Sequence, residues 1–201
     1  MKLKTYLLIG FLTVFTTAFS QSRLVYVNDL GDDWRIGLAA GIQKFAGTPS
    51  GSVSFTETLS PALELHLSKW LTPAYGLRIG YKGASFSNTY GKSVSFFTLH
   101  GECMFNVQNM FDENNTDRFW NCSPYIGTGW AASRGENKND GWALHWGVFN
   151  TFRVTSYLSA SVEFSSFLAD KEFDLRISGD EGFDKMFALT LGLIYRLNLS
   201  E

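Results

Sequence analysis

From Trp34 onward, the side chains of the chain alternate between apolar and polar with a period of two residues. The alternation is clearest in the last segment, residues 187–199, where Phe, Leu and Tyr occupy every odd position. The even positions of the same segment hold Ala, Thr, Gly, Ile, Arg and Asn. Successive side chains of a strand point to opposite faces, so this segment predicts a strand with one wholly apolar face.

The same period marks seven earlier segments. The eight predicted strands cover approximately residues 34–43, 58–70, 75–82, 94–107, 118–132, 142–153, 157–167 and 187–199. Pro124 lies inside the fifth strand and predicts a local bulge, because proline donates no ladder hydrogen bond. After the N-terminus, no segment has a helical apolar period. Strands joined in order by hairpins predict an all-β fold, an eight-stranded antiparallel up-and-down barrel.

The two faces of these strands decide which side of the barrel meets water. The apolar face is too bulky for the interior of an eight-stranded barrel, which side chains only just fill. The other face is rich in glycine and carries few, balanced charges, which suits an enclosed lumen. We therefore predict a transmembrane barrel with the apolar face toward lipid. The alternative is a soluble, lipocalin-like barrel with the apolar face inside.

The polar face predicts a network of charged side chains in the lumen. Its expected members are Arg35, Glu64, His66, Arg78, Lys82, His100, Glu102, Glu163 and Arg196. An unpaired buried charge is costly, so these groups are expected to satisfy one another. The alternative is that they gate a narrow pore.

Aromatic residues near the predicted strand ends fit the girdles that mark the two interfaces of a membrane. They are Trp34, Trp70, Tyr75, Trp130, Tyr157 and Tyr195. The connections at 71–74 and 154–156 are short, whereas those around residues 46, 134 and 168 are longer. Bacterial membrane barrels have short periplasmic turns and longer external loops, and an even strand number places both termini in the periplasm.

Residues 1–20 predict a secretion signal. Positive charge precedes an apolar stretch at 6–15, and small residues at Ala18 and Ser20 predict cleavage before Gln21. The apolar stretch is shorter than the ~20 residues of a membrane-spanning helix, which disfavours an anchor. Residues 21–33 are predicted to form a polar periplasmic lead-in, and the barrel is predicted to occupy residues 34–201.

Two short motifs carry a resemblance to a known family. Residues 123–130 read Ser-Pro-Tyr-Ile-Gly-Thr-Gly-Trp, and residues 192–197 read Gly-Leu-Ile-Tyr-Arg-Leu. The 123–130 motif resembles the Pro-Tyr-aliphatic-Gly-x-Gly strand start of the small OmpA-like and OmpX-like outer-membrane barrels, porin-family barrels of Gram-negative bacteria. The 192–197 motif resembles the closing strand that their barrel-assembly machinery reads, although this chain ends Leu-Ser-Glu rather than on an aromatic residue.

The resemblance covers the whole mature chain. We predict a monomeric outer-membrane protein without enzymatic activity. Such a protein would support envelope structure or make surface contacts through its external loops. The alternatives are a narrow pore for ions or small solutes and a lipid-modifying barrel enzyme. The expected partners are outer-membrane lipid, lipopolysaccharide and, during biogenesis, the barrel-assembly machinery. The net charge of −2, without a basic cluster, predicts no nucleic-acid partner.

The fourth and fifth strands carry the residues that suggest chemistry. Folding them about the middle of the intervening turn places Cys103 opposite Cys122 and Glu102 opposite Ser123. The cysteines predict either a strained disulfide or two free apolar thiols. His100, Glu102 and Ser123 resemble a hydrolase set, but no third group or oxyanion donor accompanies them, so no catalytic site is predicted.

A polar stretch at residues 112–117 resembles a calcium loop, but the glycine and the closing glutamate of that motif are missing. We therefore predict neither a metal site nor a cofactor.

Overall fold

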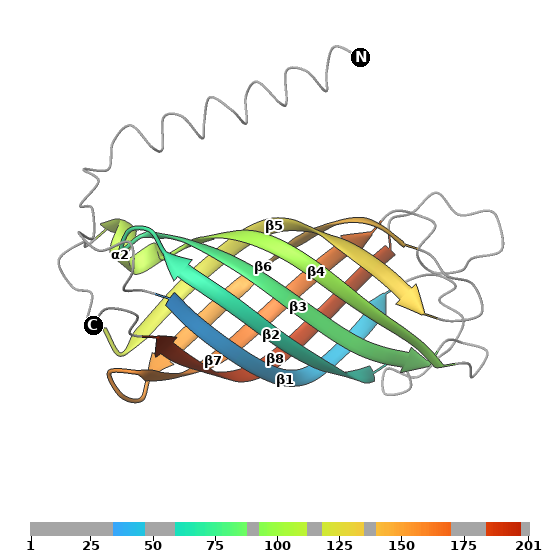
Figure 1. The fold of residues 1–201 in the computed structure, drawn as a ribbon, viewed down its shortest axis with the longest axis horizontal. Coiled ribbons are helices and arrows are strands. Elements are labelled where there is room, and N and C mark those ends of the chain that lie inside the picture. The colour runs from blue at the N-terminus through green and yellow to red at the C-terminus, as the bar shows by residue number, and fades with distance from the viewer. Residues whose placement is uncertain are drawn as a thin grey trace, which may run out of the picture.

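The computed structural model describes residues 34–46, 59–87, 93–111, 118–134, 140–169 and 184–197. The predicted signal sequence, the lead-in and the calcium-like loop lie outside these residues. The strands are β1 (Trp34–Ala46), β2 (Leu59–Trp70), β3 (Tyr75–Ser87), β4 (Ser93–Phe105), β5 (Trp120–Arg134), β6 (Asp140–Arg153), β7 (Leu158–Ala169) and β8 (Asp184–Leu197). Each strand pairs with the next and β8 pairs antiparallel with β1, so the predicted eight-stranded closed barrel is confirmed (Figure 1).

Strand pairing sets the tilt of the strands. Followed once around the barrel, the pairing that starts at Trp34 returns to β1 at Lys44, ten residues further along the strand. The partners on the way are Lys69, Leu77, Cys103, Ile126, Trp146, Ser166 and Phe187. Such a stagger tilts the strands against the barrel axis, as Figure 1 shows, and leaves an interior that side chains can fill.

The two ends of the barrel differ in their connections. β1 begins and β8 ends at the same end, where the 71–74 turn, the 154–157 turn and the connection between β4 and β5 also lie (Figure 1). We call it the turn end. The other four connections join the strands at the opposite end, the loop end.

Both short turns rest on a threonine. The Thr72 hydroxyl accepts a hydrogen bond from the backbone N–H of Tyr75 (3.0 Å). The Thr155 hydroxyl accepts one from the backbone N–H of Leu158 (2.9 Å). In each case the side chain satisfies the backbone where the next strand begins, which holds the turn tight.

A short helix that the sequence did not predict follows β4. It is α2 (Val107–Phe111), and its five residues are too few to show a helical apolar period. The Asn106 side chain accepts a hydrogen bond from the backbone N–H of Asn109 (3.1 Å) and caps the helix. Asn109 donates to the carbonyl of Pro73 (2.9 Å), so α2 is tied to the neighbouring turn. Among the described residues, no helix is long and apolar enough to cross a membrane.

The bulge predicted at Pro124 is not present. β5 pairs with β6 without interruption, and Pro124 lies opposite Val148. On its other side, the β4–β5 ladder ends at Tyr125, before it reaches Pro124. Two residues earlier, the N–H of Cys122 donates to the side chain of Gln108 (2.9 Å) instead of to a strand. The missing N–H of Pro124 therefore lies on the β4 side, beyond the end of the β4–β5 ladder, where no hydrogen bond between strands is lost.

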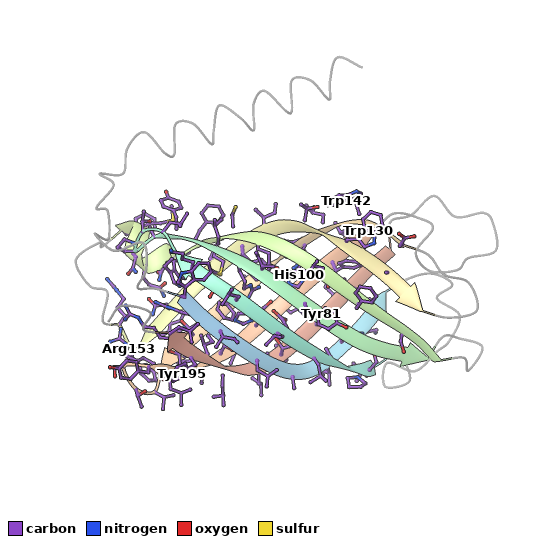
Figure 2. The ribbon with its side chains drawn as sticks, viewed as in Figure 1. Tyr81, His100, Trp130, Trp142, Arg153 and Tyr195 are labelled. Carbon is purple, nitrogen blue, oxygen red and sulfur yellow. The ribbon has the colours of Figure 1, made fainter. Side chains whose placement is uncertain are left out.

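The outer surface of the barrel is apolar. Leu38 and Leu191 are each 63% exposed. Thr190 and Glu64, which belong to the other of the two alternating sets of side chains (the inward parity), are each 1% exposed. Figure 2 shows side chains projecting from the barrel along its whole length. A closed band of exposed apolar side chains is stable against hydrocarbon rather than water, so the prediction of a transmembrane barrel is confirmed.

Aromatic side chains lie toward both ends of this band. Trp130 and Trp142 pack edge to face toward the loop end, with ring centroids 5.7 Å apart, and Tyr195 lies at the turn end (Figure 2). The placement of Trp70 in a girdle was wrong. Trp70 shares the inward parity of β2 and packs against a cluster inside the barrel. This interior apolar cluster consists of Met104, Tyr125, Phe149 and Ile194.

We expect Gly127→Ala to destabilise the barrel and Gly101→Ala to leave its stability unchanged. A Cβ at Gly127 would overlap the carbonyl oxygen of Gly101 and lie 2.8 Å from Cα of Glu102, whereas a Cβ at Gly101 would meet nothing within 4 Å. Overpacking of this kind costs about 1–3 kcal/mol. Urea unfolding measures the difference in stability. It is followed on a gel of unboiled samples, in which the folded barrel runs as a compact, faster band that is lost on unfolding. Equal stability of the two variants would contradict this register.

Candidate functional site

Charged and polar side chains from β2 to β7 fill the middle of the lumen, and we call them the lumen network. Its members are Glu64, His66, Arg78, Lys82, His100, Glu102, Tyr125, His145 and Glu163. All of them are buried. The structure thus brings together the predicted lumen residues except Arg35 and Arg196, and it adds Tyr125 and His145.

Arg78 is the centre of the lumen network. Its Nε donates to Oε2 of Glu102 on the neighbouring strand (2.5 Å). Across the lumen, Nη1 and Nη2 donate to the two carboxylate oxygens of Glu163 (2.7 and 3.1 Å). The guanidinium also lies 4.4 Å from the ring of Tyr125 and 4.7 Å from that of Phe149. Arg78 thus makes a bidentate ion pair with Glu163, a second ion pair with Glu102 and two cation–π contacts, all of them buried.

A second ion pair lies toward the loop end from Arg78. Nζ of Lys82 is 2.8 Å from Oε2 of Glu64, its cross-strand partner, and donates to the hydroxyl of Ser165 (2.8 Å). Glu64 is also 3.9 Å from Nη1 of Arg78 and 3.6 Å from Nδ1 of His66. The two ion pairs therefore form one connected network.

Two histidines face a single oxygen of Glu102. The Nδ1–H of His145 donates to Oε1 of Glu102, and Nε2 of His100 lies 3.5 Å from the same oxygen. The two imidazole rings are tilted, with centroids 4.5 Å apart. His145 was not predicted from the sequence, although the signal was present. It lies between Leu144 and Trp146, which share the outward parity of β6.

Glycines on the neighbouring strands make room for these rings. Gly80 pairs with His66 on one side and with His100 on the other, and a Cβ at Gly80 would overlap the His100 ring. Gly37 pairs with His66, and a Cβ there would overlap the His66 ring. The glycines of the polar parity are therefore the packing complement of the large lumen side chains.

Arg35 and Arg196 lie at the turn end rather than in the lumen network. They are cross-strand partners, and with Arg153 they line a cavity of about 300 Å³. The other lining residues are mostly Asn, Thr and Ser, and none of the described residues that line the cavity is acidic. The alternation puts these arginines on the lumen face of their strands, but it does not report height along the barrel axis.

The lumen is closed between this cavity and the loop end. Ile194 lines the cavity and belongs to the interior apolar cluster, whose Tyr125 and Phe149 rings flank Arg78. Toward the loop end, residues including Lys82 and His145 bound a void of about 10 Å³. That volume is close to what one water needs. The middle of the barrel is therefore filled by its own side chains.

The predicted alignment of β4 with β5 was wrong. Cys103 pairs with Ile126, and Glu102 pairs with Gly127 rather than with Ser123. Both Cys103 and Cys122 are free thiols. The connection between the strands contains α2, so it is no symmetric hairpin and its midpoint does not set the register. The alignment of His100, Glu102 and Ser123 as a hydrolase set therefore loses its geometric basis.

No protein-family model matches the sequence, and no curated protein is similar to it in sequence. Solved structures share its fold at low identity. One is Ail, the attachment invasion locus protein of Yersinia pestis, with 10% identity, a TM-score of 0.53, and coverage of 83% of this chain and 99% of that chain. Another is Neisserial surface protein A, with 11% identity, a TM-score of 0.53, and coverage of 82% and 97%.

A major outer membrane protein from Thermus thermophilus is similar as well, with 14% identity, a TM-score of 0.52, and coverage of 82% of this chain and 99% of that chain. These likenesses span the described barrel and nearly the whole of each compared chain. The chain has the fold of the eight-stranded outer-membrane β-barrels.

We expect Arg78→Gln to lower the free energy of unfolding by about 3–5 kcal/mol, because it leaves two buried carboxylates without their cation. Arg153→Gln is the matched control. Arg153 lines the cavity at the turn end, and the charge effect of a partly exposed group is about 1 kcal/mol or less. Urea titrations of the two refolded variants compare the sites. Similar losses at both positions would contradict the central role of Arg78.

Proposed function

We propose that this chain is a non-enzymatic, integral outer-membrane protein that supports envelope structure or makes surface contacts through its external loops. The observation that carries the proposal is a lumen closed by buried ion pairs inside a barrel with an apolar outer surface. A barrel of this kind offers its loops and its lipid-facing surface for interaction, and no continuous aqueous path through its described residues.

The energy of the lumen network argues against a pore. A solute passing through the middle of the barrel would have to separate Arg78 from Glu102 and Glu163. Breaking a buried pair leaves a desolvated charge and costs several kcal/mol. The rings of Tyr125 and Phe149, which flank the guanidinium, would have to move as well.

The unequal connections support an orientation in the membrane. Short turns are periplasmic and longer loops external in barrels of this type, so the turn end is assigned to the periplasm. The loops at 47–58, 88–92, 135–139 and 170–183 then face outside, and the 106–119 connection, which contains α2, is a longer turn on the periplasmic side. Two of the similar proteins carry the words attachment and surface in their names, which fits a contact role for external loops.

The route to the membrane is part of the proposal. Residues 1–20 act as a secretion signal removed before Gln21, and the barrel-assembly machinery inserts the chain as a monomer among lipid and lipopolysaccharide. N-terminal mass analysis of the mature protein tests the cleavage. A mature chain that retains residues 1–20 would contradict this assignment.

Planar-bilayer recording tests closure against the pore alternative. The wild-type barrel is expected to show no stepwise conductance. Arg78→Ala removes the side chain at the centre of the lumen and is expected to admit ions, which makes it the positive control for the assay. The variant is used only if it keeps a compact unboiled band. Regular conductance steps from the wild type would contradict the proposal of a closed scaffold and support the alternative of a narrow pore.

A further inference from the structure

The lumen holds a group of residues suited to a metal ion. One ligand atom each from His100, Glu102 and His145 lies within 4.8 Å of the others. The three side chains are between 3% and 4% exposed. They come from two strands, β4 and β6, that are not paired with each other, so the group spans the interior behind β5. Two imidazoles and one carboxylate are a ligand set that borderline divalent cations such as Zn²⁺ prefer.

A separate observation points to a ligand at this place. Nε2 of His100 is buried and has no hydrogen-bond partner within the described part of the chain. Its other ring nitrogen, Nδ1, lies 3.3 Å from the hydroxyl of Thr98. If Nδ1–H donates to Thr98, Nε2 presents a lone pair toward Glu102. A metal-bound histidine normally uses its other nitrogen in this way, to hold the ring in place.

Glu102 is prepared for the same role. Its Oε2 accepts from Nε of Arg78 (2.5 Å), which fixes the carboxylate and leaves Oε1 toward the two histidines. A carboxylate held by a neighbouring donor at one oxygen and offering the other is a common support for a metal ligand.

The charge balance of the lumen leaves room for one more cation. Among the buried side chains that the structure describes, three are carboxylates, one is an arginine and one is a lysine. The carboxylates are Glu64, Glu102 and Glu163, and the cations are Arg78 and Lys82. A proton on a histidine supplies the missing positive charge, and a divalent ion in its place supplies one charge more than these groups lack.

We propose that His100, Glu102 and His145 form a binding site for one divalent transition-metal ion, with Zn²⁺ as the reference ion. The ion takes the place of the proton between Nδ1 of His145 and Oε1 of Glu102, and that proton is released to solvent. Metal–ligand bonds of ~2.0–2.1 Å place tetrahedral ligands about 3.4 Å apart. The His145 nitrogen and the Glu102 oxygen would therefore move apart, whereas the two histidine nitrogens, which lie within 4.8 Å of each other, would move closer. A void of about 10 Å³, close to the space that one water needs, borders Thr98 and His145.

The chain supplies its own control for this site. It contains three histidines, and the third, His66, is also buried in the lumen but faces Glu64. His66→Gln therefore removes an equally buried imidazole outside the proposed site. His100→Gln and His145→Gln each remove one proposed ligand and keep a side chain of similar length.

The test uses full-length mature barrel without a polyhistidine tag, refolded in detergent after chelation, in a background with Cys103→Ser and Cys122→Ser. Elemental analysis after equilibration with Zn²⁺ gives the stoichiometry. Titration with Cu²⁺, read by electron paramagnetic resonance, counts the nitrogen ligands. The compact unboiled band of each variant confirms folding before binding is compared.

We expect one Zn²⁺ per barrel and two nitrogen ligands to Cu²⁺ in the background protein and in His66→Gln. His100→Gln and His145→Gln should each raise Kd at least tenfold and leave one nitrogen ligand. Failure of the background protein to hold an equimolar ion overturns the proposal. Zn²⁺ binding that is unchanged in His100→Gln and in His145→Gln also overturns it, because the ion would then be bound elsewhere, on the loops. An equal loss in His66→Gln would also overturn it.

Discussion

The barrel depends on one constraint, that charges enclosed in a narrow, water-poor lumen must be paired. Arg78 meets this constraint for the largest part of the lumen, because it binds two carboxylates and is covered by two aromatic rings. Glu102 and Glu163 come from strands on different sides of the barrel, β4 and β7. The pairing of charges therefore also holds the closed form of the sheet together, in addition to the ladder hydrogen bonds.

The same constraint explains the division of residue types between the two faces. A lumen that encloses large polar side chains needs small neighbours, and the His100 ring lies over Gly80 as the His66 ring lies over Gly37. The outer face has no such limit and carries leucines that hydrocarbon solvates. The closed lumen and the apolar exterior are thus two results of one packing arrangement, and together they favour a scaffold over a channel.

The alternation of apolar and polar residues was enough to predict the strands, the closed barrel and the lipid-facing side. A period of two residues indicates only to which face of the strand a side chain points. It does not report height, so Arg35 and Arg196 were assigned to the central network, although they line the cavity at the turn end. The alternation also did not predict the register between β4 and β5, because α2 occupies part of the connection between them. His145 was not predicted, because only the apolar face of β6 was assigned.

The most direct test of the account is the direction of side chains along β8. Spin labels are placed one at a time at positions 189, 191 and 193, in a background with Cys103→Ser and Cys122→Ser, in lipid vesicles. If the apolar face lies in lipid, accessibility to dissolved oxygen, which concentrates in hydrocarbon, is high at all three positions and accessibility to a water-soluble nickel chelate is low. High accessibility to the nickel chelate at these positions would mean that the apolar face is not in lipid.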